Sequence, residues 1–335
     1  MLPARSAEVV EVKEDDDREE EDETLLSIAV GRLKGHGWPS HKVWLPPLDE
    51  PPTMDKLLGG LAEVEGRGLQ ASDPAFRGAL AAPFGLIDRP RQQRRDPWWI
   101  RFDGSGGNLG VVGGPQSGKS MALRAGIAGL SLTHTPQEVG FYCLDFGGGS
   151  LTSMRNLAHV GSVTGRLDVD RVRRTVAEIT SLRSSRELQF AELGVDSMTT
   201  YRQGRRDGSI VPDRFPTDVF LVIDGWATMK TEFEALEPQI QALANGGLGF
   251  GIHVWIAAAK WSEIRSGTKD ALQSRIELKL GDPFDSEVDR KIQAIVPAAR
   301  PGRGLMSGGL HTMIGLPAST GWRTPPTSAR GSAGS

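Results

Sequence analysis

Residues 113–120 read Gly-Gly-Pro-Gln-Ser-Gly-Lys-Ser, a complete G-x-x-x-x-G-K-S phosphate loop, and no other feature constrains the fold as strongly. In such a loop the backbone N–H groups surround nucleotide phosphates, Lys119 reaches the β and γ oxygens, and the Ser120 hydroxyl ligates Mg²⁺. Residues 108–112 predict a short buried strand before the loop, and residues 121–132 predict a helix after it. That helix would direct the positive end of its dipole at the phosphates. We therefore expect ATP and Mg²⁺ as ligands, with the nucleotide contacted by Gly113, Gly114, Pro115, Gln116, Ser117, Gly118, Lys119, Ser120 and Met121.

A second chemical element is the acid that ends the apolar run VFLVI at residues 219–223. A carboxylate at the end of such a strand, downstream of a phosphate loop, is typical of the group that holds Mg²⁺. Asp224 is therefore the predicted catalytic residue, and Ser120 and Asp224 are the predicted Mg²⁺ ligands. Many P-loop ATPases place a Glu directly after this Asp, but here Gly225 follows, and glycine cannot act as a base. The next acids, Glu232 and Glu234, lie several residues further on, and the sequence leaves their reach open.

Short apolar strands alternate with helices through the rest of the middle of the chain. Further strands are predicted at residues 141–146, 252–259 and 276–280, and helices at 168–193 and 285–296, the last with Val288, Ile292 and Ile295 facing inward. This alternation predicts an α/β fold of the P-loop NTPase type, with a mainly parallel sheet covered by helices on both faces. The nucleotide is expected at the carboxyl ends of the strands.

The two ends of the chain differ from the middle in composition. Residues 1–23 form an acidic tail with the run DDDREEEDE, which predicts disorder. Residues 24–60 are predicted to be a linker that contains one helix capped by Thr24 and, at 44–52, a proline-rich extended path. Residues 318–335, rich in Ser, Gly and Pro, predict a second disordered tail. Residues 61–317 remain as the ATPase domain.

Charge and cysteine usage exclude several classes of protein. The net charge of −3 lacks the basic surplus of a general nucleic-acid binder. A single cysteine, Cys143, forms no internal disulfide, which fits a reducing cytosol, and the six histidines lack metal-binding spacing. No apolar stretch is long enough for a bilayer, and the N-terminus is unlike a signal peptide. We expect a cytoplasmic protein.

These motifs resemble those of the FtsK/SpoIIIE ATPases, and specifically the EccC-type ATPases of actinobacterial type VII (ESX) secretion systems. The resemblance covers about residues 25–317. It is carried by VWLPPLDEPP (43–52), GLIDRPRQQ (85–93), GGNLGVVGGPQSGKS (106–120), FYCLDFGGGSL (141–151), LAHVGSV (157–163), VFLVIDGW (219–226), GLGFGIHVWI (247–256), KLGDPFDSEVDRKI (279–292) and PAARPGRGL (297–305). EccC proteins carry three ATPase modules in series behind membrane helices. The Asp-Gly-Trp at 224–226 is similar to the middle module, and the stretch before residue 60 looks like the linker from the first module.

The resemblance implies a RecA/FtsK-like fold and an ATP-binding module of a secretion motor that relays its nucleotide state. The implied partners are neighbouring ATPase modules, helical secreted substrate proteins and, indirectly, a membrane complex at the inner face of the cell membrane. An oligomer is compatible with this reading, and no nucleic-acid partner is expected. Two alternatives stay open: an FtsK-like DNA translocase, and a structural scaffold that holds ATP as a fixed cofactor.

Two departures from the family pattern bear on hydrolysis. DNA-pumping relatives end the strand at 252–259 in a Thr-Gln pair that senses the γ-phosphate, whereas Ala259 and Lys260 stand here. Together with Gly225, this removes two groups that assist phosphoryl transfer. We expect ATP binding with weak or absent hydrolysis, and we expect Gly225→Glu to restore some turnover if the surrounding geometry allows it.

Two sets of arginines have more than one reading. Arg300 and Arg303 either contact nucleotide phosphates or a neighbouring module, or they belong to a turn before a hairpin. The cluster at residues 89–95, just before two tryptophans, is read as a solvated face rather than a phosphate contact.

Overall fold

The computed structural model describes residues 24–37, 40 and 45–319, and its contacts divide the chain into Met1–Val43 and Trp44–Ser335. The first unit contributes one helix, α1 (Leu25–Leu33). The Thr24 side chain caps it by accepting a hydrogen bond from the Ser27 N–H at 3.1 Å, as predicted. Both predicted disordered tails lie outside the described residues, except for residues 318 and 319.

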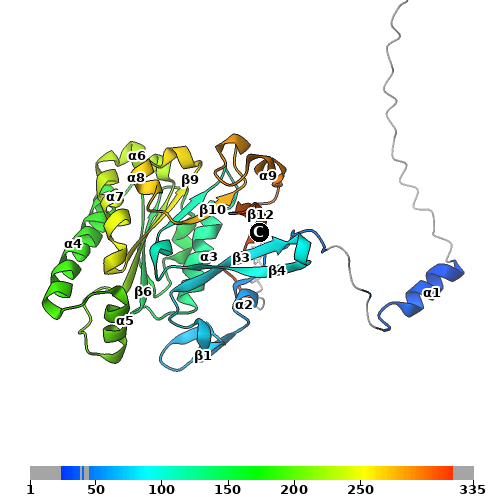
Figure 1. Cartoon of the computed structure of the whole chain (residues 1–335), viewed down its shortest axis with the longest axis horizontal. Helices are drawn as coiled ribbons and strands as arrows, with labels where there is room; N and C mark the ends of the chain where they lie inside the picture. Colours follow the sequence, from blue (N-terminus) through cyan, green and yellow to red (C-terminus); the bar gives the residue numbers. More distant parts are fainter. Residues whose placement is uncertain (1–23, 38–39, 41–44, 320–335) are drawn as a thin grey trace, which may run out of the picture. The chain divides into compact units, whose positions relative to one another are not determined.

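The second unit is built on one mixed sheet, whose ten described strands run in the order β4-β3-β12-β11-β10-β5-β9-β8-β6-β7 (Figure 1). Neighbours from β10 to β7 pair in parallel, and those from β10 to β4 pair antiparallel. The strands are β3 (Ala81–Arg89), β4 (Arg94–Arg101), β5 (Leu109–Val112), β6 (Val139–Asp145), β7 (Val160–Gly165), β8 (Asp218–Asp224), β9 (Ile252–Ala258), β10 (Ser274–Leu278), β11 (Arg303–Met306) and β12 (Leu310–Ile314), and a separate hairpin pairs β1 (Leu61–Val64) with β2 (Gly68–Ala71).

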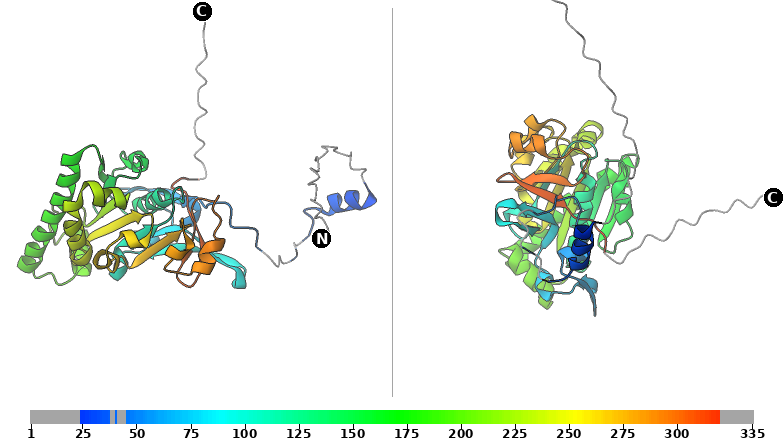
Figure 2. Two further views of the ribbon diagram at one scale, coloured as in Figure 1. Left: turned by 90° about the horizontal axis from the view of Figure 1, so that it is seen from above. Right: turned by 90° about the vertical axis from the view of Figure 1, so that its right-hand side faces the viewer.

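Helices cover both faces of this sheet. The helices of the second unit are α2 (Met54–Leu57), α3 (Lys119–Ser131), α4 (Val169–Leu193), α5 (Met198–Asp207), α6 (Trp226–Glu232), α7 (Glu237–Gly246), α8 (Ser266–Lys269) and α9 (Arg290–Ile295). In Figure 1 and the left view of Figure 2, α4 and the β3–β4 hairpin lie at opposite ends of this unit. The mainly parallel α/β fold predicted from the sequence is confirmed.

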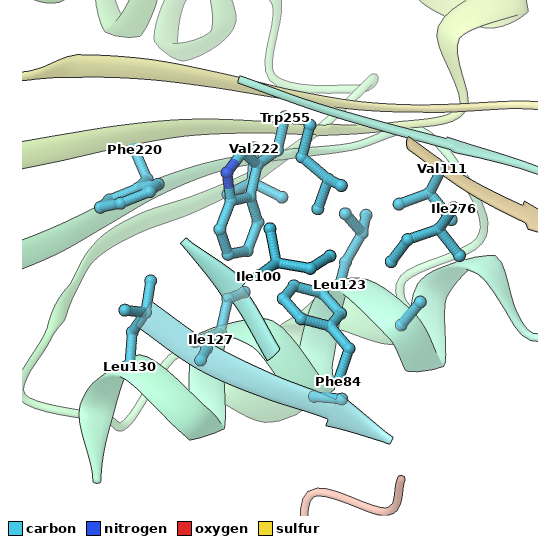
Figure 3. Packing of buried hydrophobic residues seen from close by; sticks show 14 of the residues in the cluster. Phe84, Ile100, Val111, Leu123, Ile127, Leu130, Phe220, Val222, Trp255 and Ile276 are labelled. Carbon is cyan, nitrogen blue, oxygen red and sulfur yellow. The ribbon is translucent and has the colours of Figure 1, made fainter. Parts of the chain in front are cut away.

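The strands build two cores because successive side chains point to opposite faces of a sheet. On β8, Phe220 and Val222 belong to the cluster on the α3 face, whereas Leu221 and Ile223 belong to the other. Figure 3 shows the first cluster, in which β8 and β9 side chains such as Trp255 lie over α3. The opposite cluster packs the sheet against α4, α6 and α7. A central strand buried on both faces reads as a continuous apolar run, which is why VFLVI was recognisable.

The helix predicted at 285–296 is the main error in secondary structure. Only α9 is helical, because the Ser286 hydroxyl donates a 2.6 Å hydrogen bond to the buried Glu277 carboxylate and ties the preceding backbone to β10. Asp289 then starts the helix by accepting hydrogen bonds from the N–H groups of residues 291 and 292 at 2.9 Å. Ile295, predicted to face inward, is 69% exposed.

The segment before residue 61 is more closely integrated than the sequence suggested. Residues 45–52 form neither helix nor strand, but Met54 and Leu58 of the predicted linker are buried in the α3-side core. Thr53 also forms a parallel bridge with Leu316. The contacts therefore group the described residues 45–60 with the unit that contains the phosphate loop.

Candidate nucleotide site

The phosphate loop leaves the buried strand β5 between its two parallel neighbours, at their carboxyl ends. The Gly113 N–H donates to the Ala258 carbonyl at 3.2 Å, which fixes the loop's first residue to β9. Gly118 has φ +104° at the start of α3, and a Cβ there would lie 2.8 Å from the Gly302 nitrogen. Only glycine accepts both the left-handed backbone and this close approach.

The Lys119 side chain folds back over the beginning of the phosphate loop. Its Nζ donates to the carbonyls of Gly113 at 2.7 Å and Gly114 at 2.8 Å. Burial lowers the pKa of Lys119, while the negative charges of Asp224 and Glu263 act to raise it. The ammonium therefore lies against the loop backbone, within the fields of two carboxylates, and a phosphate would replace the carbonyls as its partner.

Ser120 and Asp224 meet in space. The Ser120 Oγ donates to Asp224 Oδ2 at 2.5 Å, and the Ser150 hydroxyl lies 3.4 Å from the same oxygen. Burial raises the pKa of Asp224, opposed by the Ser120 hydrogen bond and reinforced by the charge of Asp145. A hydroxyl and a carboxylate beside a phosphate loop are hard oxygen ligands of the kind Mg²⁺ takes, so the donor set fits this ion.

The other residues predicted for the nucleotide lie along the same loop and first helical turn. Gly114 and Ser117 are buried, whereas Pro115 and Gln116 are exposed at the loop's tip. Gln116 has φ +56°, a left-handed conformation uncommon for a residue other than glycine. Met121 is partly buried and packs against the α3-side core.

Asp145 is a site residue that the sequence reasoning missed. It ends β6, in register with Asp224 at the end of β8. Its carboxylate accepts hydrogen bonds from the N–H groups of Gly149 at 3.1 Å and Leu151 at 2.7 Å, and so orders the glycine-rich turn beside Asp224. The signal was available, because an apolar strand ending in Asp occurs in FYCLDF just as it does in VFLVID.

The position after Asp224 has no room for the acid that many relatives carry. Gly225 has φ +88°, and a Cβ there would lie 2.8 Å from the Phe146 carbonyl carbon. The condition set for Gly225→Glu, that the surrounding geometry allows it, is therefore not met by this backbone conformation. Glu232 and Glu234 do not fill this role either: Glu232 stands at the far end of α6 and pairs with Arg166 at 3.6 Å, and both glutamates are exposed.

Glu263 is a second acid that the sequence reasoning missed. Its Oε2 accepts a hydrogen bond from the Ala259 N–H at 3.0 Å, just past the end of β9. Ala259 and Lys260, which stand in place of the Thr-Gln pair, are both exposed. Residues 259–262 separate Glu263 from the strand end, and a short 3-10 helix at Trp261–Glu263 carries it, so no motif marked it.

The arginines after α9 have structural partners. Arg303 donates to the Leu48 carbonyl at 2.6 Å, and burial lowers the pKa of Arg303. Arg300 lies 3.7 Å from Asp49. Between them, the Gly302 N–H donates to the Ser117 carbonyl at 2.8 Å, so this turn supports the phosphate loop from outside.

The arginine cluster before the tryptophans belongs to the β3–β4 hairpin. Arg89 and Arg94 pair with Asp96 at 2.6 and 3.1 Å, and Arg95 pairs with Asp88 at 3.7 Å. Two of these ion pairs, Arg89–Asp96 and Arg95–Asp88, join β3 to β4 at the edge of the sheet, whereas Arg94–Asp96 lies within β4.

The sequence model of the FtsK/SpoIIIE family matches residues 80–320, a stretch that includes the phosphate loop, Asp224 and the Gly302 turn. The chain belongs to the FtsK/SpoIIIE family. Over 313 residues it is 52% identical to the ESX secretion system protein EccC of Thermomonospora curvata, covering 92% of this chain and 24% of that protein. It is 40% identical over 301 residues to the ESX-1 secretion system protein EccCb1 of Mycobacterium tuberculosis, covering 89% of this chain and 48% of that one.

Solved structures give the same result for the FtsK/SpoIIIE module. The cytoplasmic domain of the Thermomonospora curvata type VII secretion ATPase EccC superposes with a TM-score of 0.85 at 53% identity, over 89% of this chain and 35% of that one. ATPases 2 and 3 of the same EccC, solved with a signal sequence peptide, superpose with a TM-score of 0.79 at 54% identity, over 82% and 49%. The chain thus spans between about a quarter and a half of these relatives. Among the described helices, none has the length and hydropathy of a membrane span.

Proposed function

We propose that this chain is an ATP-binding module of a type VII (ESX) secretion motor, and that it binds ATP with Mg²⁺ and hydrolyses it slowly. The observation that carries the proposal is the 2.5 Å contact between Ser120 and Asp224 beside the Lys119 ammonium. Half of the aligned residues are shared with EccC, whose solved structure is described as a secretion ATPase. The Asp-Gly-Trp sequence at 224–226, which begins with the last residue of β8, favours the second of the three modules.

Each group at the site would have a definite role toward the nucleotide. The loop N–H groups and the start of α3 would bind the phosphates, and the Lys119 ammonium would neutralise their charge. Ser120 and Asp224 would hold the metal ion, which supplies further charge neutralisation when bound. Slow turnover follows from the lack of an acid at position 225 and of a sensor pair at 259 and 260.

Replacing the lysine tests the phosphate site directly. Lys119→Ala should abolish measurable ATP–Mg²⁺ binding in isothermal titration calorimetry, because the ammonium contacts phosphate charge. The Lys119 ammonium hydrogen-bonds the loop carbonyls of Gly113 and Gly114, and we expect its loss to leave the circular dichroism spectrum unchanged. Lys291→Ala, which removes an exposed lysine on α9, is the matched control. Unchanged affinity in the Lys119 variant would contradict the assignment.

The relay to partners is proposed from the way the loop is supported. Ser117 contacts the turn at Gly302, and the adjacent arginines contact Leu48 and Asp49 in the chain that precedes the domain. A shift of the loop on nucleotide binding would therefore reach this segment. We propose neighbouring ATPase modules, helical secreted substrates and, through them, a membrane complex at the inner face of the cell membrane as partners.

A peptide experiment separates this motor module from the two alternatives. A helical segment of a secreted substrate should change the single-turnover rate of ATP hydrolysis, whereas duplex DNA at physiological salt should not. A salt-dependent shift of DNA by the chain would favour a translocase instead. Nucleotide that fails to exchange within hours would favour a scaffold with fixed ATP.

A further inference from the structure

The site lacks an acid after Asp224, yet a carboxylate reaches the same edge of the sheet from the neighbouring strand. β9 lies between β5, which leads into the phosphate loop, and β8, which ends in Asp224. In register, Ala258 pairs with Val112 and Ala257 pairs with Asp224. The residue after this point, Ala259, is the one whose N–H donates to Glu263.

The location of Glu263 follows from short contacts. The Ala258 carbonyl accepts a hydrogen bond from the Gly113 N–H at 3.2 Å, and the N–H of the same peptide, that of Ala259, donates to the Glu263 carboxylate at 3.0 Å. Because the carbonyl and the N–H of a trans peptide point in opposite directions, the carboxylate lies on the side of β9 that faces β8 and Asp224, away from Gly113. Its charge also reaches the Lys119 ammonium and acts to raise the pKa of Lys119, as the charge of Asp224 does.

The turn that carries Glu263 is anchored on two sides. The buried Trp261 ring packs so closely on β5 that a Cβ on Gly110 would lie 2.8 Å from it, and its Nε1 donates to Glu277 at 3.0 Å. The Glu263 carbonyl accepts hydrogen bonds from Trp226 Nε1 at 3.2 Å and Lys230 Nζ at 2.9 Å, both on the helix that follows Asp224. Groups held in this way are suited to position a reactant.

The carboxylate remains accessible. The Glu263 side chain is only partly buried, and within the described part of the chain Oε1 has no hydrogen-bond partner. One oxygen is thus fixed by the backbone while the other is free to accept a proton. Among the acids that follow the site strands, Glu232 and Glu234 lack this placement.

We propose that Glu263 orients the water that attacks the γ-phosphate and accepts its proton, in place of the acid that β8 lacks. The proposal rests on the proposed ATP-binding function. In the step, a bond forms between the water oxygen and the γ-phosphorus, and the bond from that phosphorus to the β–γ bridging oxygen breaks. One water proton passes to the carboxylate, and ADP leaves with the electron pair of the broken bond, which yields ADP and inorganic phosphate.

Glu263→Gln removes the negative charge but keeps the size and shape of the side chain, and its amide oxygen still accepts the hydrogen bond from the Ala259 N–H. Single-turnover hydrolysis of ATP with Mg²⁺ should slow by about 100-fold in this variant, the usual range for losing a general base. ATP affinity and the thermal midpoint should stay at wild-type values, because the change acts on the transition state alone. Glu232→Gln, which neutralises an exposed acid on α6, should keep the wild-type rate. Glu263→Asp keeps the charge on a side chain that is one methylene shorter, and it should also slow hydrolysis.

The outcomes distinguish this inference from the proposed function. A Glu263→Gln variant that hydrolyses ATP at the wild-type rate, or a wild-type chain that binds ATP and never hydrolyses it, would overturn the role of Glu263 alone. Lost affinity or a lowered thermal midpoint in Glu263→Gln would show a structural role and overturn it as well. A wild-type chain that fails to bind ATP would overturn the proposed function itself.

Discussion

Ser120 Oγ and Asp224 Oδ2 lie 2.5 Å apart although 104 residues separate them in the chain. At this scale the site depends on a few charges in a partly buried place. Burial raises the pKa of Asp224 and lowers the pKa of Lys119, and the charge of each group opposes the effect of burial on the pKa of the other. The Ser120 hydrogen bond adds to this by stabilising the ionised form of Asp224.

Ser120→Ala tests this hydroxyl. The variant loses one donor to Asp224 and one oxygen ligand for Mg²⁺, so ATP affinity should fall by about 10-fold with the metal and change little in EDTA. Calorimetric titration under both conditions measures the difference. Ser184→Ala, on the exposed face of α4, is the control. An equal loss with and without Mg²⁺ would argue against Ser120 as a metal ligand.

Gly225 provides the second prediction at the residue scale. Gly225→Ala should lower the free energy of unfolding by about 2 kcal/mol, because the residue has φ +88° and a Cβ would contact the Phe146 backbone. Urea unfolding followed by circular dichroism measures this. Gly249→Ala, at a site with open space and no positive φ, should have little effect. Wild-type stability in Gly225→Ala would show that the turn relaxes easily.

At the scale of elements, the strand ends opposite the nucleotide site are held by a buried ionic group. Asp218 begins β8, and its carboxylate accepts hydrogen bonds from Arg202 of α5 at 2.7 and 2.9 Å and from His253 of β9 at 3.0 Å. Burial acts to raise the pKa of Asp218, but these hydrogen bonds and charges outweigh it and hold the pKa well below its usual range. Removing one partner would leave a buried charge uncompensated.

Asp218→Asn should therefore cost about 3 kcal/mol of unfolding free energy at neutral pH. Because the folded-state pKa is lowered, the stabilisation is present above the ordinary carboxylate pKa of about 3.9 and is lost as pH falls below it. The gap between the wild type and the variant should thus shrink from pH 7 to pH 3. Urea titrations at several pH values measure it. A gap that stays constant with pH would show that packing, rather than charge, sets the cost.

For the whole molecule, ligand binding and stability are coupled by mass action. If the native state alone binds ATP–Mg²⁺, nucleotide at 100 times its Kd should add about 2.7 kcal/mol to the free energy of unfolding. Differential scanning calorimetry should show a concentration-dependent rise in Tm for the wild type and none for Lys119→Ala. A rise of equal size in that variant would place the stabilising nucleotide somewhere other than the phosphate loop.

The sequence alone determined the local chemistry and the class of fold. The phosphate-loop motif lies between a strand and a helix, so the sequence of Gly113–Ser120 also predicted a strand before it and a helix after it. Apolar runs such as VFLVI identified the central strands, because a strand buried on both faces admits few polar residues. The family resemblance, also visible in the sequence, is confirmed by the match over residues 80–320.

Tertiary structure decided what lies beside the loop. The order β5-β9-β8 differs from the order along the chain, so nothing local placed Glu263 on the β8 side of β9 or Asp145 next to Asp224. Helix propensity at 285–296 yielded to a hydrogen bond from Ser286 to a buried acid on another strand. The local sequence pattern favours individual helices and strands. Contacts between residues far apart in sequence decide which of these elements lie next to one another and how much space remains between them.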